Sequence, residues 1–224
     1  MNILNPDLER EKRCGIPEVV FAAGKTLEDL EEITDRFLRD CGRVIITKVD
    51  DEKAGGLIDG VSGKKFRIIH NKKGRVLVFK KKNMKVNVVG GVGLLTAGTS
   101  DIPVAEEARA VAEELGCNVA YEYDVGIAGI HRVYPALETL KKSQVFIVIA
   151  GMEGALPSIV AGLVLAPVIA VPTSVGYGTA EHGKTALFTM LNSCTPLAVM
   201  NVDNGYGAAV LAYKILISGS SKGK

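Results

Sequence analysis

Five glycine-rich or polar turns between Val92 and Ala209 each follow a run of β-branched apolar residues. They span residues 96–101, 124–126, 150–154, 172–176 and 201–205. We expect strands at 92–97, 118–123, 145–150, 168–172 and 197–202, and helices at 103–116, 130–142, 155–166, 181–192 and 205–217. This alternation predicts an α/β fold with a doubly wound parallel sheet.

The turns that follow parallel strands gather at one edge of the sheet, where open α/β sheets bind ligands. The sequence therefore predicts a single composite site, built from several turns that lie far apart in the chain.

Residues 1–85 have a different pattern, typical of a small α+β domain that ends in a basic linker. Short strands are expected at 19–21 and 44–46, a helix from Thr26 to about residue 40, and a hairpin around the turn 71–74. We expect the α/β domain to cover 86–218 and residues 219–224 to form a disordered tail.

Composition limits the classes of function. The net charge is only +2, aromatic residues make up 5% of the chain, and the basic excess is confined to the region before Val86. Without aromatic interleaving or a reading helix, this pattern argues against nucleic-acid binding. The longest apolar run, 159–171, contains Gly162 and Pro167 and is too short to span a bilayer, so we expect no membrane association. Four scattered cysteines and a charged N-terminus favour free thiols and a cytoplasmic location.

The turn after the first strand of the α/β domain carries Gly98, Thr99, Ser100 and Asp101. Free backbone N–H groups at a helix start, together with hydroxyl donors, suit a phosphate or carboxylate. Asp101 is a candidate ligand for a ribose hydroxyl or a metal ion. The alternative is that Ser100 or Asp101 only caps the helix.

Three further polar residues stand at expected turns. His131 is a candidate proton shuttle and Arg132 a candidate clamp for carboxylate or phosphate, unless they are a structural histidine and a surface arginine. Glu153 is a candidate base or cation ligand, or simply an exposed turn residue. Gly151 beside it leaves room for a ligand to approach the backbone.

We expect the last two turns, 172–176 and 201–205, to form part of the wall of the ligand pocket. Thr173, Ser174 and Tyr177 are candidate hydrogen-bond donors to a ligand, and Asp203 and Asn204 are candidates to hold a ribose or to begin the next helix. Cys194 lies between an expected helix and strand, and on spacing alone a small buried cysteine is its simpler interpretation.

Taken together, these segments resemble the LarB family of nickel-pincer cofactor biosynthesis enzymes, within the wider superfamily of aminoimidazole ribonucleotide carboxylases. The matching stretches cover nearly the whole chain and comprise 15–21, 24–26, 96–108, 123–132, 150–158, 167–178, 190–194 and 201–205.

The resemblance implies carboxylation of nicotinic acid adenine dinucleotide at C5 of its pyridinium ring and cleavage of its phosphoanhydride. The products would be AMP and pyridinium-3,5-biscarboxylic acid mononucleotide. By matching position, Cys194 would be the nucleophile that adds at C4, with His131 or Glu153 as the base. Carbon dioxide or bicarbonate would be the co-substrate, Mg²⁺ the accompanying ion with Glu153 as a candidate ligand, and a homo-oligomer, as an octamer, the assembly.

Two other functions stay open. The purine-pathway carboxylases of the superfamily have Ser-Ala-His-Arg where this chain has Gly129-Ile130-His131-Arg132, and they lack the cysteine. A non-catalytic nucleotide-binding module would keep the pocket without the chemistry. Loss of Cys194 should abolish activity under the first interpretation and change little under the other two.

Overall fold

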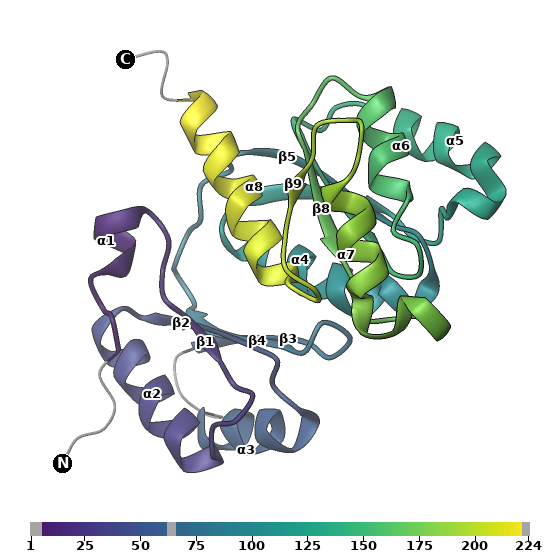
Figure 1. The fold of residues 1–224 in the computed structure, drawn as a ribbon. Coiled ribbons are helices and arrows are strands. Elements are labelled where there is room, and N and C mark those ends of the chain that lie inside the picture. The colour runs from purple at the N-terminus through teal and green to yellow at the C-terminus, as the bar shows by residue number, and fades with distance from the viewer. Residues whose placement is uncertain (1–5, 62–65, 221–224) are drawn as a thin grey trace. The chain divides into compact units, whose positions relative to one another are not determined.

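The computed structural model describes residues 6–61 and 66–220, which form two units with their boundary between Lys85 and Val86 (Figure 1). The sequence analysis placed its boundary at the same residue. Each unit is described by itself.

The N-terminal unit contains a four-stranded mixed sheet and three helices. Its elements are α1 (Arg10–Cys14), β1 (Val19–Phe21), α2 (Leu27–Asp40), β2 (Arg43–Thr47), α3 (Asp51–Val61), β3 (Phe66–Asn71) and β4 (Val76–Lys81). The strand order is β1-β2-β4-β3, in which only β1 and β2 are parallel. The small α+β domain is confirmed, although the sequence patterns did not predict α1 or α3.

Helix α2 forms where the sequence predicts it because both its cap and its apolar face are present. The Thr26 hydroxyl accepts a hydrogen bond from the N–H of Asp29, and the Asp29 carboxylate accepts one from the N–H of Thr26. This reciprocal capping satisfies two backbone donors at the helix start. The buried side chains of α2 then pack with those of β2 and β4, including Phe37 and Phe79, to form the core of this unit.

The C-terminal unit alternates strands and helices. Its elements are β5 (Gly90–Thr96), η1 (Thr99–Asp101), α4 (Ile102–Glu114), β6 (Cys117–Glu122), η2 (Ile127–Arg132), α5 (Val133–Thr139), β7 (Val145–Ala150), α6 (Leu156–Leu163), β8 (Val168–Pro172), η3 (Gly178–Gly183), α7 (Lys184–Leu191), β9 (Ala198–Val199) and α8 (Gly205–Ser220). Helix α8 takes in Gly219 and Ser220, which the sequence analysis had assigned to the disordered tail; the rest of that tail, 221–224, lies outside the described residues.

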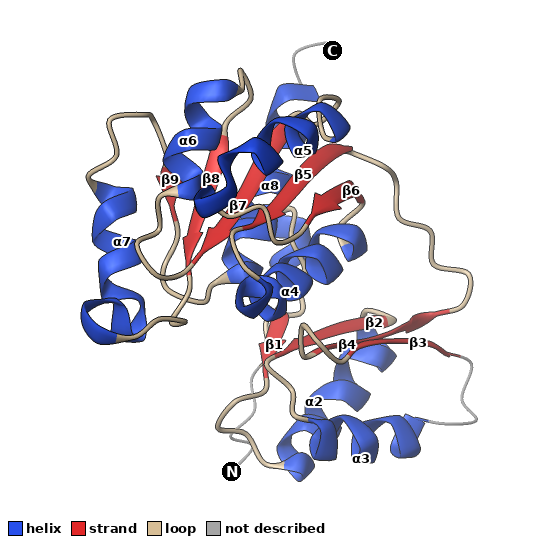
Figure 2. Ribbon diagram, turned by 90° about the vertical axis from the view of Figure 1, so that its right-hand side faces the viewer, coloured by secondary structure: helices blue, strands red, loops and turns tan. Residues whose placement is uncertain are grey.

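All five strands are parallel, in the order β6-β5-β7-β8-β9. Helices α4 and α8 pack against each other and against one face of the sheet, while α5, α6 and α7 share a buried cluster with the other face (Figure 2). The predicted doubly wound sheet is therefore confirmed. The chain leaves β5 for β6 on one side and then passes to β7 on the other, so the order reverses at β5, the position where such sheets open a ligand crevice.

Strand β7 shows why the sheet forms from this sequence. All six of its residues, 145–150, are buried, as expected for a central strand covered by helices on both faces.

In the part of the chain that the structure describes, no helix combines the length and the apolar character needed to cross a bilayer.

Candidate active site

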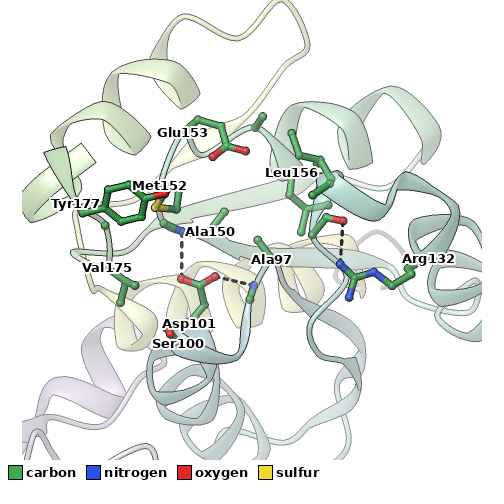
Figure 3. A pocket seen from close by; sticks show the side chains of 17 residues that line it. Ala97, Ser100, Asp101, Arg132, Ala150, Met152, Glu153, Leu156, Val175 and Tyr177 are labelled. Atoms are coloured by element: carbon green, nitrogen blue, oxygen red, sulfur yellow. Dashed lines mark hydrogen bonds between the residues drawn. The ribbon is translucent and has the colours of Figure 1, made fainter. Parts of the chain in front are cut away.

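A pocket of about 480 Å³ opens at the carboxyl edge of the C-terminal sheet, beside β5 and β7 (Figure 3). Its walls come from the loops after β5, β6, β7 and β8: Ala97, Gly98, Ser100, Asp101, Gly126, Ile127, Ala128, Arg132, Ala150, Gly151, Met152, Glu153, Ala155, Leu156, Val175, Gly176 and Tyr177. The volume is within the usual range for a small-molecule site.

The loops after β7 and β8 approach each other closely. A Cβ atom on Gly151 would lie 2.3 Å from the carbonyl oxygen of Val175, so only glycine fits there. The N–H of Met152 donates to that same carbonyl at 3.0 Å. This contact fixes the two loops as one wall of the pocket.

Asp101 is the buried centre of the site. One of its carboxylate oxygens accepts hydrogen bonds from Thr173 Oγ1 at 2.7 Å and from the N–H of Gly151 at 3.1 Å, and the other accepts from the N–H of Gly98 at 2.9 Å. Burial raises the pKa of Asp101, although these three hydrogen bonds lower it. The carboxylate thus ties together the loops after β5, β7 and β8, and it does not act as a simple side-chain cap of α4.

Arg132 brings a cation to the pocket. Its Nη1 donates to the carbonyl oxygen of Asp124 at 2.6 Å and its Nη2 to that of Gly126 at 3.4 Å, while the Asp124 carboxylate lies 3.4 Å away. These bonds hold the guanidinium group beside the loop after β6, on a different side of the pocket from Asp101 (Figure 3).

Glu153 lies across the pocket from Ser100 and Asp101 (Figure 3). It is exposed and stands between Met152, whose φ is 51°, and Gly154, whose φ is 66°. Both neighbours of Glu153 therefore have left-handed backbone conformations. Because Glu153 is exposed within a concave wall, a bound ligand could contact it directly.

Several of the residues predicted for the site do not line the pocket. Thr173 is fully buried and reaches the site only through Asp101. Asp203 accepts a hydrogen bond from the N–H of Ser174 at 2.9 Å, and Asn204 accepts one from the N–H of Gly207 at 2.8 Å, which caps α8. Thr99 is exposed beside Ser100 and does not line the pocket.

The structure does not bring His131 or Cys194 into the pocket. Both are exposed, and neither lines it. The expectation from spacing that Cys194 is buried is wrong, because the segment after α7 runs over the surface. Of the two candidate bases, only Glu153 borders the cavity.

The lining residues that sequence reasoning missed are mostly small or apolar: Ala97, Ile127, Ala128, Ala150, Met152, Ala155, Leu156 and Val175. Such side chains carry no chemical signature. The signal they do carry is their place at the end of a strand or in the segment that follows it.

The donor set can be compared with what Mg²⁺ requires. Of the two carboxylates at the pocket, Asp101 already accepts three hydrogen bonds, which leaves Glu153. Over residues 6–61 and 66–220 there is no group of three or more His, Cys, Asp or Glu side chains placed to hold a metal ion. One carboxylate suits Mg²⁺ that is bound mainly by substrate phosphates and water, and does not suit a resident ion held by protein alone.

We compared the sequence of the chain with models of known protein families. A model of AIR carboxylase matches residues 91–222, more than half of the chain. The chain belongs to the AIR carboxylase family. In this family member, residues 1–82 also match the LarB/PurE-like N-terminal domain. The predicted superfamily is therefore confirmed.

Relatives of this AIR carboxylase family member include proteins with and without a described activity. The chain is 48% identical over 213 residues to an uncharacterized protein of Methanocaldococcus jannaschii, a match that covers 93% of this chain and 82% of that protein. It is 34% identical over 128 residues to the N5-carboxyaminoimidazole ribonucleotide mutase of the same organism, covering 55% and 76% of the two chains. The mutase of Pyrococcus horikoshii is 36% identical over 133 residues, covering 56% and 71%.

Proposed function

We propose that this chain carboxylates C5 of the pyridinium ring of nicotinic acid adenine dinucleotide and hydrolyses its phosphoanhydride. The products are pyridinium-3,5-biscarboxylic acid mononucleotide and AMP. The observation that carries the proposal is the joining, in one chain, of a LarB/PurE-like N-terminal domain over 1–82 and an AIR carboxylase domain over 91–222.

The substrate explains why a cysteine would be needed. A pyridinium ring is electron-poor, so its C5 cannot attack carbon dioxide. Addition of the Cys194 thiolate at C4 forms a C–S bond and leaves an enamine whose C5 is nucleophilic. C5 then bonds to the carbon of CO₂, a base takes the C5 proton, and the thiolate leaves with its electron pair as the ring becomes aromatic again. No oxidant or reductant is required.

The pocket offers groups for the remaining roles. Glu153 is the base of the proposal because it borders the cavity, whereas His131 does not. Arg132 and the turn at Gly98–Ser100 suit the phosphates and the carboxylates of the substrate. Mg²⁺ would arrive with the diphosphate and would offset the charge of its phosphates.

A second candidate is the rearrangement of N5-carboxyaminoimidazole ribonucleotide, which the names of the M. jannaschii and P. horikoshii relatives favour. That substrate is already an electron-rich enamine, so it needs no thiol. The two candidates therefore differ in whether Cys194 is required.

Mass spectrometry of the reaction products separates them. The purified chain is incubated with nicotinic acid adenine dinucleotide, bicarbonate and Mg²⁺, next to the Cys194→Ser variant. We expect AMP and the biscarboxylated mononucleotide from the parent and neither from the variant. No turnover of this dinucleotide, together with turnover of N5-carboxyaminoimidazole ribonucleotide by both chains, would favour the second candidate.

A further inference from the structure

Tyr177 is an exposed aromatic side chain on the wall of the pocket. It lies in the loop after β8, borders the cavity and is 77% exposed. In the described part of the chain, the rings that stack on each other are those of Tyr121 and Tyr123, and Tyr177 makes no such contact. Its large, flat face is therefore open to a ligand, and aromatic faces prefer other rings and cations.

The backbone around Tyr177 is held in place on both sides. Before it, the carbonyl of Val175 accepts the N–H of Met152 at 3.0 Å, and an added Cβ on Gly176 would lie 2.6 Å from the carbonyl oxygen of Ala180. After it, the N–H of Ala180 donates to the carbonyl of Tyr177 at 3.1 Å. None of these contacts uses the Tyr177 ring. A fixed backbone with an open ring is preorganised for binding, because less freedom is lost when a ligand arrives.

The ring of Tyr177 is on the same side of the pocket as the proposed base. Glu153 follows Met152, whose N–H is bonded to the loop that carries Tyr177. Figure 3 shows these three residues on one side of the cavity and Arg132 on the other. In the proposed reaction the pyridinium ring presents its C5 proton to Glu153, whereas Arg132 suits phosphate. Of the two rings of the dinucleotide, the pyridinium ring is therefore the one that reaches Tyr177.

The charge of the pyridinium ring suits the face of a tyrosine. The ring is a cation, and the face of an aromatic side chain attracts cations because its π electrons make that face negative. The exposed carboxylate of Glu153 on the same side adds to this attraction. The reduced dinucleotide has a neutral dihydropyridine ring, which lacks it. The reduced ring also cannot react, because it has no electron-poor C4 for a thiolate to attack.

We propose that Tyr177 stacks on the pyridinium ring and selects the oxidised, cationic dinucleotide over its reduced, neutral form. This inference rests on the proposed function, in which the pyridinium ring is the reacting group. Tyr177 then determines specificity through its ring and not through its hydroxyl group. Because the ring loses its charge when the thiolate adds and regains it when the thiolate leaves, the contact acts on the binding of substrate and product.

Calorimetric titration in a Cys194→Ser background measures this contact without turnover. The probes are nicotinic acid adenine dinucleotide and its chemically reduced form. For Tyr177→Leu we expect the Kd of the oxidised form to rise about 3- to 30-fold and that of the reduced form less than about twofold, as for the loss of a cation–π contact. Tyr177→Phe keeps the ring and should bind both forms as Tyr177 does. Tyr134→Leu, at a tyrosine that is 58% exposed and does not line this pocket, is the matched control and should change neither Kd.

Three results would overturn the inference: an unchanged Kd in Tyr177→Leu, an equal loss for both forms, or the same loss in Tyr177→Phe, which would assign the contact to the hydroxyl group. Failure of the proposed function gives a different result, namely selective binding of the oxidised form that depends on Tyr177, without turnover by the parent chain. Absence of binding of either form while Tyr177 is intact would overturn both.

Discussion

A single carboxylate, Asp101, joins three of the loops that form the pocket. Because Thr173 is buried and its hydroxyl group donates to Asp101, the Thr173→Val variant removes that hydrogen bond with little change in shape. We expect it to lower the free energy of unfolding by about 1–3 kcal/mol, the usual cost of a lost hydrogen bond that leaves a buried acceptor short of a partner. Urea denaturation measures this. The exposed Thr179→Val variant serves as the control, and equal stability of both variants would contradict the role of Asp101.

The pH dependence of stability reports on the same carboxyl group. Burial raises the pKa of Asp101, so the folded chain takes up this proton more readily than the unfolded chain. The stability from Asp101 is therefore fully present below its ordinary pKa and is lost as the pH rises through its raised pKa. We expect the unfolding free energy of the parent, relative to Asp101→Asn, to increase as the pH falls from about 7 to about 4. A flat or opposite trend would count against the burial of an ionisable group here.

Arg132 is held by two carbonyl oxygens, and a lysine cannot keep that geometry while it also contacts a substrate anion. Under the proposed function we expect Arg132→Lys to raise KM for nicotinic acid adenine dinucleotide by about tenfold or more, the equivalent of one lost charge-assisted hydrogen bond. Steady-state kinetics measure this. Arg109→Lys, in which the parent arginine pairs with Glu106 and Glu113 on α4, should leave KM unchanged.

At the scale of elements, periodicity and caps predicted most of the C-terminal sheet. Continuous apolar runs predicted β7 and β8, and the helix expected at 103–116 corresponds to α4, which has Pro103 in its first turn and Gly116, with a φ of 99°, just after its end. Helix α3 was missed because Gly55, Gly56 and Gly60 lie within it, and glycine disfavours helix interiors. It forms because Ala54, Leu57 and Val61 are buried and Asp50 accepts a hydrogen bond from the N–H of Lys53 at its start. Tertiary packing thus outweighs local propensity there.

These glycines give a matched pair of variants. An added Cβ at Gly55 meets no atom within 4 Å, whereas at Gly56 it would lie 2.8 Å from Leu27 Cδ2. We expect Gly55→Ala to raise the free energy of unfolding by about 0.5–1 kcal/mol by restricting the unfolded chain. Gly56→Ala should gain less or lose stability, because Leu27 must shift. Denaturant unfolding of the two variants side by side checks the difference, and a larger gain at Gly56 would contradict the packing described for α3.

At the scale of the whole molecule, the sequence patterns predicted a division into two units near residue 85 and a cavity at the carboxyl edge of the sheet. They could not predict which turn residues face the cavity. The turn at 201–205 supports the site through Asp203 and adds no lining residue, because Asp203 bonds to the backbone of Ser174. Nor could spacing locate Cys194, since the path of the segment after α7 depends on contacts with α6 that no local pattern records.

Under the proposed function, this chain couples carboxylation of the pyridinium ring to cleavage of the phosphoanhydride. The most direct test supplies ¹³C-bicarbonate with nicotinic acid adenine dinucleotide and Mg²⁺ and follows both products by mass spectrometry. We expect one labelled carboxyl group in the mononucleotide for each AMP released, and neither product from Cys194→Ser. Release of AMP without incorporation of label, or labelled product from the variant, would contradict it.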